Sequence, residues 1–234
     1  MKEALVEFAA KLQKKFAPTV HVLIAKLLFT MFLGELQTRL SSPEEINREL
    51  HKYGVWIGSR CMAQLAKPED LEKIHPRDQE PHKVARGMSL YGRLAWYLFA
   101  GHLPTLETEV IETENGAVIK GVLKPDPEKD YFIRGVVSMK GVNLFYFTSG
   151  AYEAAAQMGF QMLNIDNLWW SVWRPLKQEE GLVGFYIWRK VPVEKAVKII
   201  EENAPWFFET VSLEDSAKYL KEYLGVSIPV PQSQ

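Results

Sequence analysis

The sequence is poor in cysteine: Cys61 is the single one among 234 residues. One cysteine excludes an internal disulfide and any metal site built from several thiolates. Such low cysteine usage is typical of proteins in a reducing compartment, so we expect a cytoplasmic location.

The chain also lacks a surplus of charge of either sign, with 28 basic and 29 acidic residues. Nucleic-acid-binding proteins usually carry a basic surplus, so this class is disfavoured. A long apolar run is missing as well. The most apolar stretch, Val20–Leu36, contains His21, Lys26 and Glu35, which predicts a buried helix rather than a membrane span.

Familiar catalytic motifs are absent from the sequence. It contains no G-x-S-x-G, H-E-x-x-H, P-loop or G-x-G-x-x-G pattern. A metal site near His75 and His82 lacks fixed ligand spacing. A haem site would need a histidine in an apolar pocket, for which His21 is the one candidate. We therefore expect neither catalytic nor metal-binding residues, and no obligatory cofactor.

Helix signals dominate the first hundred residues. Residues 2–16 form an amphipathic pattern, which indicates a helix packed on its own domain or a partner, with a membrane-surface anchor as the alternative. Ser42-Pro43-Glu44-Glu45 is a helix start signal, and it predicts a helix to about residue 66. Another helix is expected over residues 84–100. Gly54 and Gly58 lie one turn apart and predict close approach of another element.

Two β-hairpins are predicted further along. Leu106–Thr113 and Ala117–Leu123 flank an Asn-Gly turn. Leu168–Arg174 and Leu182–Arg189 flank a polar turn. Between the hairpins, an apolar helix from about residue 142 should stop at Gly159. The expected fold class is therefore α+β, with an antiparallel sheet of about four strands packed on a layer of long helices.

The second hairpin is apolar on both faces, so each face needs a cover. We expect its outer face to carry Trp169, Trp173, Tyr186 and Trp188. Two amphipathic helices follow, and we predict that residues 193–224 cap this face within the same chain. The rival hypothesis is that the tail docks on another protein.

These patterns divide the chain into three parts. Residues 1–18 form an N-terminal amphipathic helix, residues 19–190 an α+β domain, and residues 191–234 a C-terminal extension of two helices.

Three runs stand out along the predicted helices: Tyr53–Arg60, with a glycine pair before an arginine; Arg93–Gly101, with an exit glycine; and Ser149–Ala154, a small-residue helix segment. These runs resemble the small subunits of the TRAPP vesicle-tethering complex, of the Bet-three type, and the related four-vinyl-reductase domain. Their order is similar to that of the family over about residues 20–190. The tail after residue 190 is not part of the usual pattern.

The resemblance implies a non-catalytic scaffold that pairs with a second copy or with related small subunits and takes part in vesicle tethering. Peripheral contact with a membrane is also implied. The alternative is a sensor that binds a small hydrophobic ligand or lipid. The family's acylated cysteine would fall near Ile74, so covalent acylation there is excluded and a non-covalent acyl chain is the remaining form.

An enclosed apolar tunnel is also implied by the resemblance. The expected hydrophobic pocket comprises Cys61, Leu65, Trp96, Phe99, Phe145, Phe147 and Phe185. The residues themselves predict a dimer, because the helix over residues 20–40 is apolar around much of its circumference and one domain face cannot bury it all. The expected dimer interface comprises Leu23, Leu27, Met31, Gly54 and Gly58.

Overall fold

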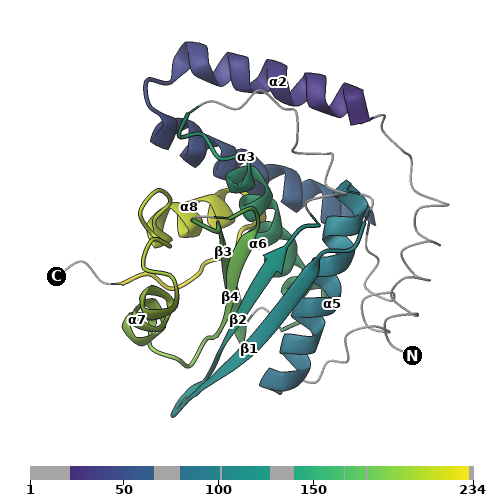
Figure 1. Cartoon of the computed structure of the whole chain (residues 1–234). Coiled ribbons are helices and arrows are strands. Elements are labelled where there is room, and N and C mark those ends of the chain that lie inside the picture. Colours follow the sequence, from purple (N-terminus) through teal and green to yellow (C-terminus); the bar gives the residue numbers. More distant parts are fainter. Residues whose placement is uncertain are drawn as a thin grey trace.

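The computed structural model describes residues 22–65, 80–100, 102–126, 140–165, 167–177 and 179–231, without the side chains of 22–26, 61–65, 98 and 99. The helices are α2 (Val22–Arg39), α3 (Pro43–Leu65), α5 (Pro81–Ala100), α6 (Phe145–Met162), α7 (Val193–Asn203) and α8 (Leu213–Leu224). The strands are β1 (Thr105–Thr113), β2 (Gly116–Lys124), β3 (Trp169–Pro175) and β4 (Leu182–Trp188) (Figure 1). The predicted N-terminal helix lies outside the described residues.

The four strands form one antiparallel sheet in the order β1-β2-β4-β3. Both predicted hairpins are confirmed, and the two inner strands β2 and β4 pair with each other. The first hairpin turns through Glu114 and Asn115 into Gly116, whose φ of 140° suits glycine. The expected α+β class, with a sheet of four strands packed on helices, is therefore confirmed.

One face of the sheet, here called the inner face, packs against α5 and α6. Side chains alternate along a strand, so Trp169 and Trp173 of β3 share this face with Tyr186 of β4. The ring centroids of Trp173 and Tyr152 are 5.1 Å apart, and Tyr152 belongs to α6. Large aromatic side chains thus fill the space between the sheet and the two helices.

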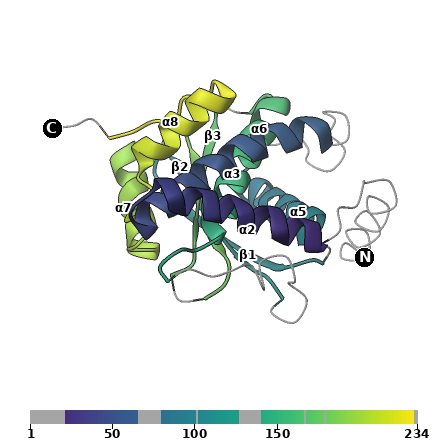
Figure 2. The same cartoon turned by 90° about the horizontal axis from the view of Figure 1, so that it is seen from above.

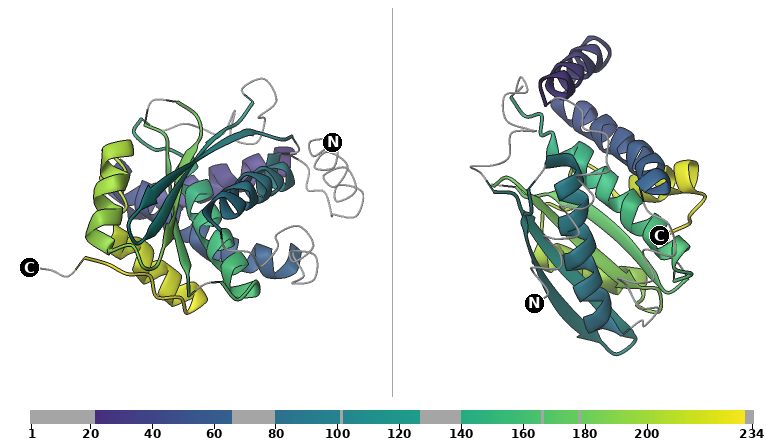
Figure 3. Two further views of the ribbon diagram at one scale, coloured as in Figure 1. Left: turned by 90° about the horizontal axis from the view of Figure 1, so that it is seen from below. Right: turned by 90° about the vertical axis from the view of Figure 1, so that its right-hand side faces the viewer.

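The opposite, outer face carries Trp170, Val172, Phe185 and Ile187, and it is covered by the C-terminal extension. α5 and α7 lie on opposite sides of the sheet (Figure 3). The prediction that the tail caps the hairpin within the same chain is confirmed. The predicted face is wrong: Trp169, Trp173 and Tyr186 face α5 and α6, because alternation separates two faces without telling which one the preceding helix meets.

The helices stack outward from the inner face. α3 packs along α6, and α2 lies across α3 on the outside of the molecule (Figure 2). Leu33 and Leu36 of α2 are buried against Ile46 and Leu50 of α3. None of the helices in the described ranges is long and apolar enough to cross a membrane.

Local capping residues mark both ends of α8 but not those of α6 and α7. Ser212 opens α8 with a capping box completed by Asp215, and Gly225 closes it in the left-handed conformation. α6, however, runs through Gly159 to Met162, so the predicted stop at Gly159 is wrong. The left-handed residue that follows this helix is Asn164, with φ of 56°, which takes the terminating role glycine often fills.

Candidate functional site

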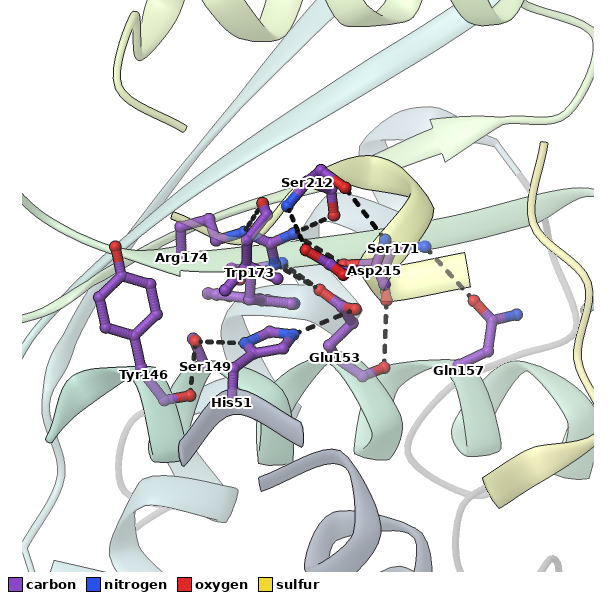
Figure 4. Close-up of polar contacts among 12 residues, drawn as sticks. His51, Tyr146, Ser149, Glu153, Gln157, Ser171, Trp173, Arg174, Ser212 and Asp215 are labelled. Atoms are coloured by element: carbon purple, nitrogen blue, oxygen red, sulfur yellow. Dashed lines mark hydrogen bonds and ion pairs between the residues drawn. The ribbon is translucent and has the colours of Figure 1, made fainter. Parts of the chain in front are cut away.

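A cluster of buried polar side chains lies where α3, α6, β3 and the C-terminal extension meet (Figure 4). We call it the polar cluster. Its members are His51, Ser149, Glu153, Gln157, Ser171, Arg174 and Ser216, each at most 1% exposed. Burying polar groups costs free energy unless they are paired, so the partners of each group decide what the cluster can do.

Close contact between α3 and α6 brings His51 next to Ser149 and Glu153. A Cβ atom on Gly54 would overlap the carbonyl oxygen of Phe147, and one on Gly150 would overlap the carbonyl oxygen of His51. Glycine is the residue type that lets two helix backbones approach so closely. The predicted reason for the glycine pair, close approach of another element, is confirmed, and that element is α6.

Arg174 is fully hydrogen-bonded although it is buried. Its Nη1 donates to Glu153 Oε2 at 2.9 Å and to the Trp173 carbonyl at 2.6 Å. Its other bonds reach the C-terminal extension: Nε donates to the Val211 carbonyl, and Nη2 donates to the Ser212 carbonyl and to Ser216 Oγ. A guanidinium has five N–H donors, and every one of them has an acceptor here.

The same guanidinium also joins the apolar part of the extension. Its central carbon lies 5.2 Å from the centre of the Phe207 ring, within the range of a cation–π contact. Phe207 in turn packs on Phe185, with the two ring centroids 5.2 Å apart. Arg174 therefore ties the extension to the sheet through polar and aromatic contacts together.

Glu153 and Gln157 of α6 cover the free edge of β3. The backbone N–H of Trp173 donates to Glu153 Oε2 at 3.0 Å, and that of Ser171 donates to Gln157 Oε1 at 3.4 Å. These donors point away from β4 and would otherwise be unpaired. α6 thus completes the sheet with side chains instead of a further strand.

The charge state of Glu153 follows from its neighbours. Burial opposes its ionisation, but the Arg174 guanidinium and His51 outweigh burial, so the pKa of this carboxyl is lowered. Glu153 is therefore a carboxylate that balances the charge of Arg174.

His51 lies between Ser149 and Glu153. Its Nδ1 is 2.9 Å from Ser149 Oγ, and its Nε2 is 3.5 Å from Glu153 Oε1. Burial lowers the pKa of His51 more strongly than Glu153 raises it, so the ring is neutral at pH 7. Ser149 Oγ donates to the Tyr146 carbonyl at 2.8 Å, and the tautomer of His51 decides which ring nitrogen carries the proton.

Ser149, His51 and Glu153 have the residue types of a hydrolase triad, yet their setting differs from one. A nucleophilic serine must meet substrate, whereas all three side chains here are at 0% exposure. Ser149 also lies inside α6, where its hydroxyl is 2.8 Å from the Tyr146 carbonyl. In this conformation the three residues join α3 to α6 and cannot reach a substrate.

The residues of the predicted pocket fall into three separate clusters. Trp96 and Phe145 stack with ring centres 6.1 Å apart, between α5 and α6. Phe147 contacts Phe29 on the α2 side, whereas Phe185 contacts Phe207 beyond the sheet. The side chains of Cys61, Leu65 and Phe99, and residue Ile74, lie outside the described residues.

The predicted dimer-interface residues also separate. Leu27 and Met31 on α2 are 55% and 71% exposed. Gly54 and Gly58 are buried against α6 of the same chain, so their assignment to an interface with another chain is corrected. The side chain of Leu23 lies outside the described residues.

The comparisons with known proteins do not indicate a function for the chain. No family model matches the sequence, and no curated protein matches it. Among the described residues, no group of three or more His, Cys, Asp or Glu side chains is placed to hold a metal ion.

The polar cluster is not evident from the sequence pattern. One signal was visible: Glu153 stands in an alanine-rich helix, and Arg174 ends an aromatic strand expected to be buried on both faces. A charge in a buried element needs a partner. Periodicity could not name that partner, because Glu153 and His51 are about a hundred residues apart in sequence and their meeting depends on the packing of α3 on α6.

Proposed function

We propose that the protein is a non-catalytic scaffold of the TRAPP small-subunit, Bet-three type, which pairs through its outer helices and assembles in a cytoplasmic tethering complex. The observation that carries this proposal is an apolar stripe on α2. Leu27, Leu28 and Met31 are 55%, 58% and 71% exposed.

α2 is apolar on two sides. Its inner side, with Leu33 and Leu36, is already buried against α3. Burying apolar surface is favourable by roughly 25 cal/mol per Å², so the outward stripe favours a protein partner. In a symmetric dimer the same stripe would meet its copy; a related small subunit would meet it in a heterodimer.

The arrangement of the domain supports the same proposal. The three runs that resemble the family lie in α3, α5 and α6, and the elements follow in the order helices, hairpin, helix and hairpin. The two hairpins form one four-stranded sheet. α2 and α3 form the outermost layer, where helices that pair with another chain would have to lie. Contact with a membrane, if the assembly makes one, would be peripheral.

Sedimentation of the full chain tests this function. At roughly 50 µM, well above a micromolar Kd, we expect a dimer. The double variant L27E/M31E should be a monomer with an unchanged circular dichroism spectrum, because both side chains are exposed. V230E is the matched control, since Val230 is also an exposed apolar residue but belongs to the C-terminal extension instead of α2. The V230E variant should remain dimeric. A purified wild type that is monomeric would refute the homodimer. Co-expression with related small subunits would then test the heterodimer.

A second candidate function is a sensor for a hydrophobic ligand, of the four-vinyl-reductase type. It is favoured by Trp96, which stacks on Phe145 and whose buried Nε1 has no hydrogen-bond partner among the described residues. A ligand with an acceptor atom would satisfy that donor. Native mass spectrometry should then show a retained mass that is lost on denaturation; a spectrum of the bare chain from several expression hosts would argue against the sensor.

A further inference from the structure

His51 is covered by the C-terminal helix α8. The imidazole and the Tyr219 ring of α8 are 6.3 Å apart, and both residues are buried. α3 and α6 provide the other walls around His51. Of these neighbours, α8 belongs to the extension, whereas α3 and α6 belong to the central stack of the domain.

The charged groups around His51 come from four elements. α6 contributes Glu153, at 3.5 Å from Nε2, and β3 contributes Arg174, which binds the same carboxylate. α8 contributes Asp215 and Tyr219. On α3 itself, Arg48 is 3.6 Å from Asp215, and Glu49 pairs with Lys52.

An imidazolium at His51 would share its nearest counter-charge with Arg174. It could donate from Nδ1 to Ser149 Oγ, whose hydroxyl donates to the Tyr146 carbonyl, and from Nε2 toward Glu153 Oε1 at 3.5 Å. Glu153, the carboxylate of the polar cluster, already balances Arg174. The cluster would therefore hold one unbalanced positive charge away from solvent, which is costly unless the imidazolium becomes exposed.

α8 has caps of its own at both ends. Ser212 with Asp215 caps its N-terminus and Gly225 closes its C-terminus, so these terminal groups keep their partners if the helix moves as a unit. Its contacts with the domain include the buried Leu213, Tyr219 and Leu220, and the Arg174 bonds to Ser212 and Ser216. Arg48 also pairs with Asp215, and Gln161 Nε2 donates to the Leu224 carbonyl. The segments on either side are packed in the hydrophobic core, through Phe207 before α8 and through Val226 and Ile228 after it.

We propose that α8 is an acid-opened lid, which closes over neutral His51 and swings away when His51 takes up a proton. Opening would expose the polar cluster and the flank of α3. At low pH the protein would then present a surface that is buried in the closed form. This inference is independent of the proposed association through α2, which lies on the other side of α3.

The direction of the pH effect is fixed by linkage. The closed form holds His51 with a pKa below the ordinary 6.5, so the open form binds the proton more tightly. The closed form therefore loses stability as the pH falls below 6.5. For a single proton, the equilibrium constant for opening should rise up to about tenfold per pH unit.

Hydrogen exchange of the full chain measures this opening. Between about pH 7.5 and about pH 5.5, and after correction for intrinsic exchange rates, the amides of α8 should lose protection by up to roughly tenfold per pH unit. The amides of β2 and α5 should keep theirs. H51Q, whose side chain cannot titrate, should show the same α8 protection at both values. H82Q is the control, since His82 is well exposed on α5, and it should behave as wild type.

A direct titration of His51 in the wild-type protein keeps the inference testable if H51Q does not fold. The imidazole signals of His51 should titrate below pH 6.5, together with the loss of α8 protection. Unchanged α8 protection down to about pH 5.5, or a pH response retained in a folded H51Q, would overturn the lid.

Discussion

Arg174 and Glu153 form an ion pair sealed from solvent, with Nη1 and Oε2 2.9 Å apart and the side chains 1% and 0% exposed. A buried pair of this kind is weak evidence of added stability, but removing one partner leaves an uncompensated charge. The pair also has a topological role, since it joins α6 to β3 while Arg174 holds the C-terminal extension.

Replacing Glu153 by glutamine tests the pair. E153Q keeps the size of the side chain but removes its charge, which leaves Arg174 buried without a counter-charge. We expect the free energy of unfolding to fall by about 3–5 kcal/mol, measured by urea denaturation. E109Q is the control, because Glu109 is exposed on β1, and it should change stability by less than about 0.5 kcal/mol. Equal stability of E153Q and E109Q would contradict the role given to the pair.

A methyl group at Gly54 should separate α3 from α6. It would overlap the Phe147 carbonyl oxygen, and forcing backbones apart costs about 1–3 kcal/mol or more. Gly159 offers a matched control within a helix, since a Cβ there meets nothing within 4 Å. G159A should stabilise the protein by about 0.5–1 kcal/mol. Thermal melting of both variants checks the pair of expectations, and a stable G54A would show that the helices can move apart at little cost.

Phe207 should matter more than its neighbour in sequence. It is 1% exposed and contacts both Phe185 and Arg174. F207A should therefore destabilise the chain by about 3–5 kcal/mol. Phe208 is only partly buried, so F208A should cost less than about 2 kcal/mol. Urea denaturation of the two variants side by side decides the order, and the reverse order would refute it.

Deleting residues 192–234 should expose the outer face of the sheet. Trp170 and Phe185 would lose their cover, and Arg174 would lose its acceptors on Val211, Ser212 and Ser216. We expect a lower melting temperature together with aggregation or a new oligomer, seen by light scattering. A soluble, monodisperse truncation that melts at the wild-type temperature would mean that the extension is not needed as a cap.

Local patterns predicted the elements well. The Asn-Gly signal located the first hairpin, and the Ser-Pro-Glu-Glu start signal placed α3 within a residue of its observed start. These features depend on neighbours within a few residues. The helix α6 continues through Gly159 because glycine within a helix costs only about 1 kcal/mol, which the packing of α6 offsets.

The candidate site could not be predicted in the same way. Each member of the polar cluster is ordinary in its own segment: His51 is one of several scattered histidines, and Arg174 stands at the end of a strand. Their relation depends on which face of the hairpin meets α6 and on where the extension folds back. Alternation within a strand leaves both questions open, and the same ambiguity led to the wrong choice of hairpin face.

The two margins of the sheet determine how copies of this protein can and cannot join. At β3, the outward N–H groups of Ser171 and Trp173 are occupied by side chains of α6. At β1, the exposed Glu107, Glu109 and Glu112 place negative charge along the other margin. Unpaired strand edges are the usual template for strand addition and fibre growth, and charge or cover blocks them. Polymerisation by sheet extension is thus disfavoured at both margins, and assembly is directed to the helical side of the molecule.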